Sequence, residues 1–74
     1  MHHNEALNKK TLGQQTEDRL MKYILDQPVA IGEKIPNEFA LTEIFGVGRS
    51  TVREAVKGLV SRGVLEVRRG DGTY

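Results

Sequence analysis

The residues best suited to bind a ligand form one basic row in the C-terminal half of the chain. Arg49, Arg53 and Lys57 follow one another at four-residue steps. On an α-helix each step rotates the side chain by only about 40°, so the three cations form one stripe. Guanidinium groups bind guanine edges or phosphates through paired hydrogen bonds, and the hydroxyls of Ser50 and Thr51 can reach phosphates or bases. The row therefore predicts contact with duplex DNA.

A second basic group lies close to the C-terminus. Arg68, Arg69 and Gly70 precede Asp71 and Gly72, a pair that is typical of a tight hairpin turn. At the tip of such a hairpin we expect Arg69 to meet phosphates. Gly70 lets the main chain approach a nucleic acid closely.

The charge of the chain is unevenly distributed. The net charge is only +1, from 11 Lys+Arg and 10 Asp+Glu. Residues 46–74 hold six cationic side chains against three anionic ones, whereas residues 1–45 hold five against seven. The basic C-terminal part favours an anionic partner.

Three helices are expected to position these groups. The first, residues 11–27, begins at a capping box in which Thr11 and Gln14 each satisfy an amide at the helix start, and it ends before Pro28. Its apolar stripe consists of Leu20, Met21, Ile24 and Leu25. This spacing predicts an amphipathic helix with one buried side.

The second and third helices are separated by a short turn. The second, residues 37–45, has Asn37 as its N-cap and ends at Gly46 in a left-handed conformation. The third, residues 49–62, ends before Gly63. The residues that helical spacing predicts to be buried are Leu41, Ile44 and Phe45 in the second helix and Val52, Ala55, Val56, Leu59 and Val60 in the third.

A β-hairpin is predicted after the third helix. Residues 64–68 alternate, with Leu65 and Val67 on the buried face, and a return strand follows the turn. These elements predict a mainly α protein with a small β wing, a winged helix-turn-helix of three helices and a C-terminal β-hairpin. Residues 11–74 are expected to form this domain, and residues 1–10 a flexible N-terminal arm.

Composition excludes several classes of protein. The chain has no cysteine, which excludes disulfides and thiolate metal sites. His2 and His3 are adjacent near the terminus and are expected to be solvated, so no metal or other cofactor is predicted. No carboxylate pair has catalytic spacing in an apolar setting, so an enzyme is not expected. The longest apolar run, residues 28–31, is far shorter than a membrane span, and the cytoplasm is the expected compartment.

Other interpretations of the same residues are open at this point. Basic residues on a helix commonly form a solvated face, and an Asp-Gly pair commonly makes a plain turn. Thr51 and Glu54 have capping-box spacing, in which case Thr51 serves its own helix rather than DNA. Winged helices also act as protein-interaction or dimerisation modules without DNA, and the apolar stripe of the first helix would then be the dimer face.

Three stretches of the chain match the motifs of a known family. Residues 31–38, IGEKIPNE, are similar to the stretch PGxxLPSE, and residues 46–56, GVGRSTVREAV, to the signature GVSRTTVREAL. Residues 59–74 resemble the ending LxxxGLxxxxxGxGTF. Together these matches make residues 24–74 closely resemble the DNA-binding domain of GntR-family bacterial transcriptional regulators.

The resemblance implies sequence-specific binding to double-stranded DNA, with residues 49–62 in the major groove and residues 68–73 at the minor groove. It implies a homodimer on a palindromic operator, and a C-terminal domain for a small-molecule effector that lies outside these 74 residues. The hairpin, which stops two residues into its return strand, likewise indicates a fragment of a longer protein. The positions that match the family's DNA contacts are Arg49, Ser50, Thr51, Arg53 and Gly70.

Two departures from the family pattern concern DNA contacts. Gly48 replaces the usual serine or threonine, so that a side-chain phosphate contact is lost. Phe39 stands where family members often have arginine, which removes a base or phosphate contact from the second helix. We therefore expect changes in operator sequence and affinity more than in the mode of binding.

Overall fold

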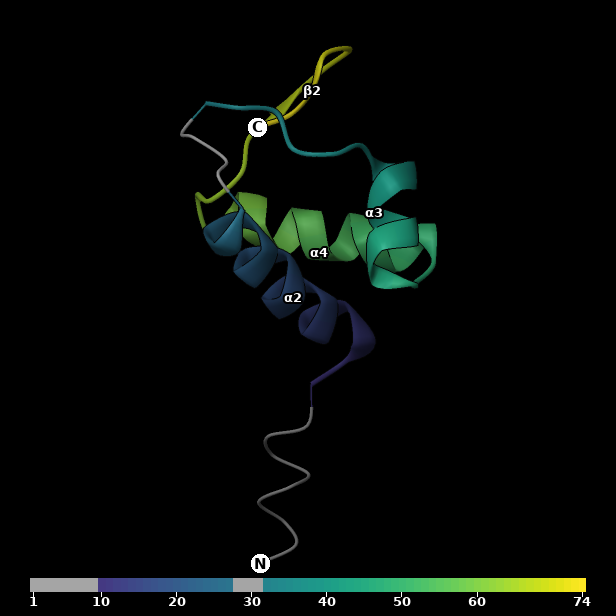
Figure 1. The fold of residues 1–74 in the computed structure, drawn as a ribbon. Helices are drawn as coiled ribbons and strands as arrows, with labels where there is room; N and C mark the ends of the chain where they lie inside the picture. Colours follow the sequence, from purple (N-terminus) through teal and green to yellow (C-terminus); the bar gives the residue numbers. More distant parts are fainter. Residues whose placement is uncertain (1–9, 28–31) are drawn as a thin grey trace, which may run out of the picture.

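The computed structural model describes residues 10–27 and 32–74, which form three helices and one small hairpin (Figure 1). The elements are α2 (Leu12–Asp26), α3 (Glu38–Phe45), α4 (Arg49–Ser61), β1 (Val67–Arg68) and β2 (Gly72–Thr73). The predicted arm over residues 1–10, with His2 and His3, lies almost wholly outside the described residues. Within the described ranges, no helix is long and apolar enough to cross a bilayer.

Helix α2 begins and ends within one residue of its predicted bounds. The capping box is present: the Gln14 amide donates to Thr11 Oγ1 at 3.1 Å, and the Thr11 amide donates to Gln14 Oε1 at 3.0 Å. Leu20 is buried as predicted, but Leu25 is 72% exposed, so the predicted stripe is too wide. The reason is that α2 packs chiefly against α4, and one neighbouring helix covers only a narrow arc of its surface.

Helix α3 is held at both ends by the predicted residues. Asn37 Oδ1 accepts from the Ala40 amide at 2.8 Å, and Gly46 ends the helix with a φ of 65°. Leu41 and Phe45 are buried, whereas Ile44 is exposed, contrary to the prediction. Ile44 is rotated by about 100° from Phe45 around the helix, away from α4.

Helix α4 forms the centre of the core. Val52, Ala55 and Leu59 are buried at helical spacing, with Val56 and Val60 partly buried beside them. The helix packs against both α2 and α3. The inner face of α4 is therefore covered by the other helices, and a ligand can contact only the opposite face.

The hairpin projects beyond the three helices (Figure 1). Strands β1 and β2 pair antiparallel, with Val67 opposite Thr73 and Arg68 opposite Gly72. The Ile35 amide donates to the Thr73 carbonyl at 2.9 Å, which ties the connector before α3 to the hairpin. This bond fixes the position of the hairpin relative to the helices.

The strand predicted over residues 64–68 is much shorter in the structure. The amides of Val64 and Leu65 donate to the Leu59 carbonyl, at 2.9 and 3.3 Å, and so close the end of α4 instead of joining a ladder. Leu65 is buried as predicted, but Val67 is 58% exposed. Strand β1 belongs to the hairpin that projects beyond the helices, and the Val67 side chain is therefore largely uncovered.

Candidate nucleic-acid interface

The start of α4 leaves its first amides open. The N-cap is Gly48, in an extended conformation with a φ of −78° and a ψ of 168°, and no side chain caps the helix. The capping interpretation of Thr51 with Glu54 is therefore wrong, because Thr51 lies inside the first turn. The unbonded amides and the positive end of the helix dipole make this turn suited to a phosphate.

The basic row lies on the outer face of α4, as its spacing predicts. The side chains of Arg49 and Arg53 are 71% and 62% exposed, and Lys57 is exposed further along the same stripe. Ser50 is exposed beside them, whereas Thr51 is half-buried. The cations of this row therefore face outward, where a ligand can reach them.

Two residues of the row, Arg53 and Lys57, line the same groove as the hairpin. This groove, of about 600 Å³, has Ser50, Arg53 and Lys57 on its α4 side and Val67 and Thr73 on its hairpin side. A rod-like ligand that lies along α4 would therefore meet the hairpin as well. The sequence alone did not predict this groove, since it joins two separate elements, α4 and the hairpin.

The remaining predicted residues do not line this groove. Arg49 and Thr51 are at the start of α4, and Arg69 and Gly70 are at the hairpin tip, all outside the groove lining itself. Gly70 has a φ of 74°, a left-handed conformation that favours glycine in the turn. Arg69 is exposed and has no ion pair within residues 10–27 and 32–74.

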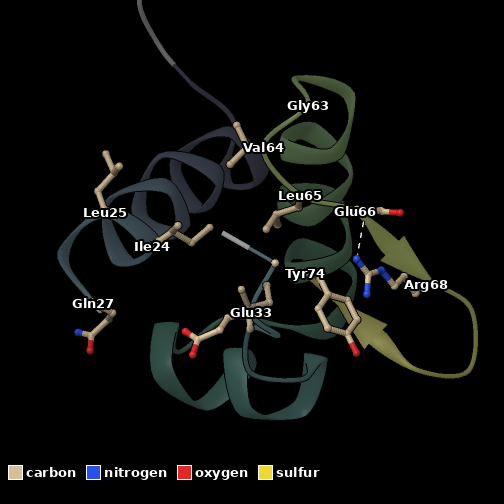
Figure 2. Close-up of a pocket in the computed structure, with 12 residues that line it drawn as sticks. Ile24, Leu25, Gln27, Glu33, Gly63, Val64, Leu65, Glu66, Arg68 and Tyr74 are labelled. Carbon is tan, nitrogen blue, oxygen red and sulfur yellow. Dashed lines mark ion pairs between the residues drawn. The ribbon is translucent and has the colours of Figure 1, made fainter. Parts of the chain in front are cut away.

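The neighbouring arginine is held by the hairpin itself (Figure 2). The guanidinium of Arg68 lies 4.1 Å from the centre of the Tyr74 ring, and 3.7 Å separates Arg68 Nη2 from Glu66 Oε1. These residues line a second cavity on the other face of the hairpin, away from the basic row. Of the two wing arginines, Arg69 is therefore the one available to an outside ligand.

Tyr74 is also anchored to the hairpin turn. Its phenol donates to Asp71 Oδ2 at 2.7 Å. This hydrogen bond raises the pKa of Tyr74 above its ordinary value, with burial and the negative charge of Asp71 acting in the same direction and Arg68 opposing them. The contact stabilises the turn that presents the hairpin tip.

Sequence reasoning missed Glu38 as part of the interface. Its carboxylate accepts from Arg53 Nη1 at 2.9 Å through one oxygen, and its other oxygen lies 3.5 Å from Arg49 Nη2. The sequence placed Glu38 only in the first turn of a helix, where an acidic residue is common. No local pattern signals this pairing, because the short turn joins only the end of α3 to the start of α4, and the packing of the two helices brings Glu38 to Arg49 and Arg53.

Sequence reasoning also missed Lys34. Its aliphatic stem lies over Gly72 in β2, where an added methyl group would overlap it. Lys34 is exposed, and among the described residues it forms no ion pair. The bond between Ile35 and Thr73 places this lysine beside the hairpin. The sequence predicts extended backbone at Ile35, with a one- or two-residue bridge in a small sheet, but not its partner strand.

Comparison with known proteins places this geometry in a family. The family model described as bacterial regulatory proteins, gntR family, matches residues 12–74. The mannosyl-D-glycerate transport/metabolism system repressor MngR of Escherichia coli (strain K12) is 40% identical over 68 residues, which cover 92% of this chain and 28% of MngR. The chain thus spans less than a third of the length of the curated relatives it matches first.

Solved structures agree with this match. A structure described as Streptococcus agalactiae GntR has a TM-score of 0.81 and 53% identity over 84% of this chain and 30% of that chain. One described as mutant ORR3 in complex with the NTD of AraR gives a TM-score of 0.79 at 33% identity, over 90% of this chain and 96% of that chain. The winged helix-turn-helix prediction is confirmed, and DNA binding is favoured over an enzyme or a DNA-free interaction module. The chain belongs to the gntR family of bacterial regulatory proteins, and it is the helix-turn-helix domain with which such transcriptional regulators bind DNA.

Proposed function

We propose that α4 enters the major groove of an operator while the hairpin tip reaches the adjacent minor groove. The shared groove between α4 and the hairpin carries this proposal, since a duplex lying along α4 meets both elements. The major groove, about 12 Å wide, admits one α-helix. The open amides at the start of α4 bind a phosphate at the groove edge.

The exposed cations divide into two proposed roles. Arg49 and Arg53, on the first turns of α4, bind guanine edges, because guanidinium forks match the O6 and N7 acceptors. Lys57, Arg69 and Lys34 bind phosphates, since each is exposed and lies along or beside the groove. Residues that support these contacts through hydroxyls or close main-chain approach are Ser50, Thr51 and Gly70.

The whole regulator is proposed to act as a homodimer on a palindromic site, because a two-fold symmetric dimer binds two half-sites that are related by the same symmetry. Residues 11–74 form its DNA-binding domain. A further domain for dimerisation and a small-molecule effector is proposed from the share of MngR that this chain spans. MngR is named a repressor, and we propose repression, at DNA in the cytoplasm, for this protein as well.

Selection of bound oligonucleotides followed by titration tests the assignment of roles. Arg49→Ala should weaken binding to the selected duplex by about 1–3 kcal/mol and relax the preference at one base pair. Arg69→Ala should weaken binding to all duplexes alike and reduce the slope of log K against log salt by about 0.9.

Lys22→Ala provides the matched control for loss of one positive charge. Lys22 is 78% exposed on α2, away from the groove, and pairs only with Asp26 among described residues. The Lys22→Ala variant should bind both the selected and the random duplex almost as tightly as the unmodified protein does. Equal weakening of selected and random duplexes by Arg49→Ala would contradict base readout.

A further inference from the structure

One carboxylate joins the two arginines proposed to read bases. Glu38 uses Oε2 for Arg53, at 2.9 Å, and Oε1 for Arg49, at 3.5 Å. The Glu38 side chain is 30% exposed, about half the exposure of either arginine. The pairing therefore lies under the guanidinium groups and leaves their outer sides in solvent.

We infer that Glu38 is a positioning residue that sets DNA specificity, by holding Arg49 and Arg53 side by side and by opposing their contact with phosphates. This inference rests on the proposed function, in which the two arginines face DNA. It assigns Glu38 no contact with a base. Its role is carried out through the two guanidinium groups.

The positioning part follows from the geometry of the pair. A long arginine side chain loses rotamer freedom when it binds, and a guanidinium has five N–H donors in a fixed fork. Glu38 pairs with one nitrogen of each guanidinium group, which leaves the other N–H donors for an outside acceptor. The two forks are thus oriented before DNA arrives, so less freedom is lost on binding a base.

The specificity part follows from charge. Two guanidinium groups with one carboxylate carry a net charge of +1 instead of +2. A phosphate is an anion and loses much of its attraction to such a cluster, while the edge of guanine is neutral and loses less. Because specificity is a difference of affinities, weaker binding to every phosphate raises discrimination in favour of the matching base.

The decisive experiment compares Glu38→Gln with Glu43→Gln in the full 74-residue chain. Glu43 lies on the same helix, is exposed, and has no ion pair within the described part of the chain, so it controls for the general loss of one negative charge. Binding is measured on the duplex selected by the unmodified protein and on a scrambled duplex, over a range of salt concentrations.

Glu38→Gln should bind the scrambled duplex about threefold to tenfold more tightly, with the slope of log K against log salt steeper by about 0.9, equivalent to one further phosphate contact. The ratio of selected to scrambled affinity should fall about tenfold. Glu43→Gln should leave that ratio and slope unchanged.

Glu38→Asp separates the two parts of the inference. Aspartate keeps the charge but is too short to bridge both arginines, so binding to scrambled DNA should stay weak while the preference for the selected duplex falls. Thermal unfolding of each variant shows whether α3 has lost stability through its first turn.

Four outcomes would overturn the inference. One is equal weakening on both duplexes that follows a fall in Tm, which indicates a structural role. A second is that Glu38→Gln loses the preference at one base pair only, while its affinity for the scrambled duplex does not change. That result indicates direct contact of Glu38 with a cytosine amine. The others are an unchanged Glu38→Gln variant and a Glu43→Gln variant that behaves in the same way. If the unmodified protein selects no sequence, the proposed function itself fails, and this is observed before any variant is tested.

Discussion

The two faces of α4 each have an arginine paired with a glutamate at almost the same distance. On the side that faces α2, called the inner side, Nη1 of the C-cap residue Arg62 donates to Glu17 Oε2 at 2.8 Å, and on the outer face Arg53 Nη1 donates to Glu38 Oε2 at 2.9 Å. Glu17 is only 18% exposed and lies against Gly58, where an added methyl group would overlap its carboxylate. The outer pair lines the groove, and its arginine side chain is 62% exposed.

The comparison shows that the surroundings of an ion pair, and not its length, determine its role. In the inner pair the carboxylate is largely buried but Arg62 is 48% exposed, and the pair joins α2 to the C-terminal end of α4. It therefore contributes modestly to the stability of the helix packing. The outer arginine can bind DNA through its remaining donors while it stays paired with its carboxylate, because most of the side chain is in solvent. Variants on the two faces should therefore separate stability from DNA affinity.

The largest expected effect is on stability, from Leu59→Ala on the inner face. Leu59 is fully buried, and its truncation should lower the free energy of unfolding by about 2–5 kcal/mol. Urea unfolding followed by circular dichroism measures the change. Leu25→Ala is the matched control, since the same atoms are removed from an exposed site, and a comparable loss there would contradict the described core.

Arg53→Ala on the outer face should have the next largest effect, and on DNA affinity alone. Loss of a fork to a base should weaken binding to the selected duplex by about 1–3 kcal/mol. The free energy of unfolding should change by less than about 1 kcal/mol, because exposed ion pairs contribute little. Anisotropy titration and urea unfolding of the same sample test this, and a large fall in stability with intact binding would reverse the assignment of the faces.

Glu17→Gln sharpens the comparison on the inner face. Loss of the pair with Arg62 should lower the free energy of unfolding by about 0.5–1 kcal/mol. Discrimination between selected and scrambled duplexes should not change, because Glu17 is not in the groove. Relaxed specificity in this variant, like that expected for Glu38→Gln, would show that the two pairs are equivalent after all.

The smallest expected effect concerns Tyr74→Phe at the hairpin turn. Because the bond to Asp71 raises the pKa of Tyr74, the stability it contributes is fully present below the ordinary pKa of tyrosine. It is lost as the pH rises through the raised value, where the phenol ionises. The Tm of the unmodified protein should exceed that of Tyr74→Phe at neutral pH, and the difference should disappear in strong alkali. A constant difference would mean that the phenol does not titrate within the hairpin.

Local signals in the sequence predicted the helices well. The cap residues Thr11, Asn37 and Gly46 act through neighbours three or four residues away, so their effect is readable from the chain alone. The apolar spacing of α4 identified its buried face for the same reason. Predictions failed where burial depends on a distant element: Leu25 and Val67 are exposed because nothing in the described structure covers them.

The amino-acid sequence by itself determined the three helices, the winged helix-turn-helix class and the row of Arg49, Arg53 and Lys57, because these depend on periodicity and on caps within one or two helical turns. Tertiary structure alone decided that Arg53 and Lys57 share a groove with the hairpin and that Glu38 pairs with the two arginines. Those features depend on how the turn between α3 and α4 and the bond between Ile35 and Thr73 orient separate segments, and no local pattern encodes that orientation.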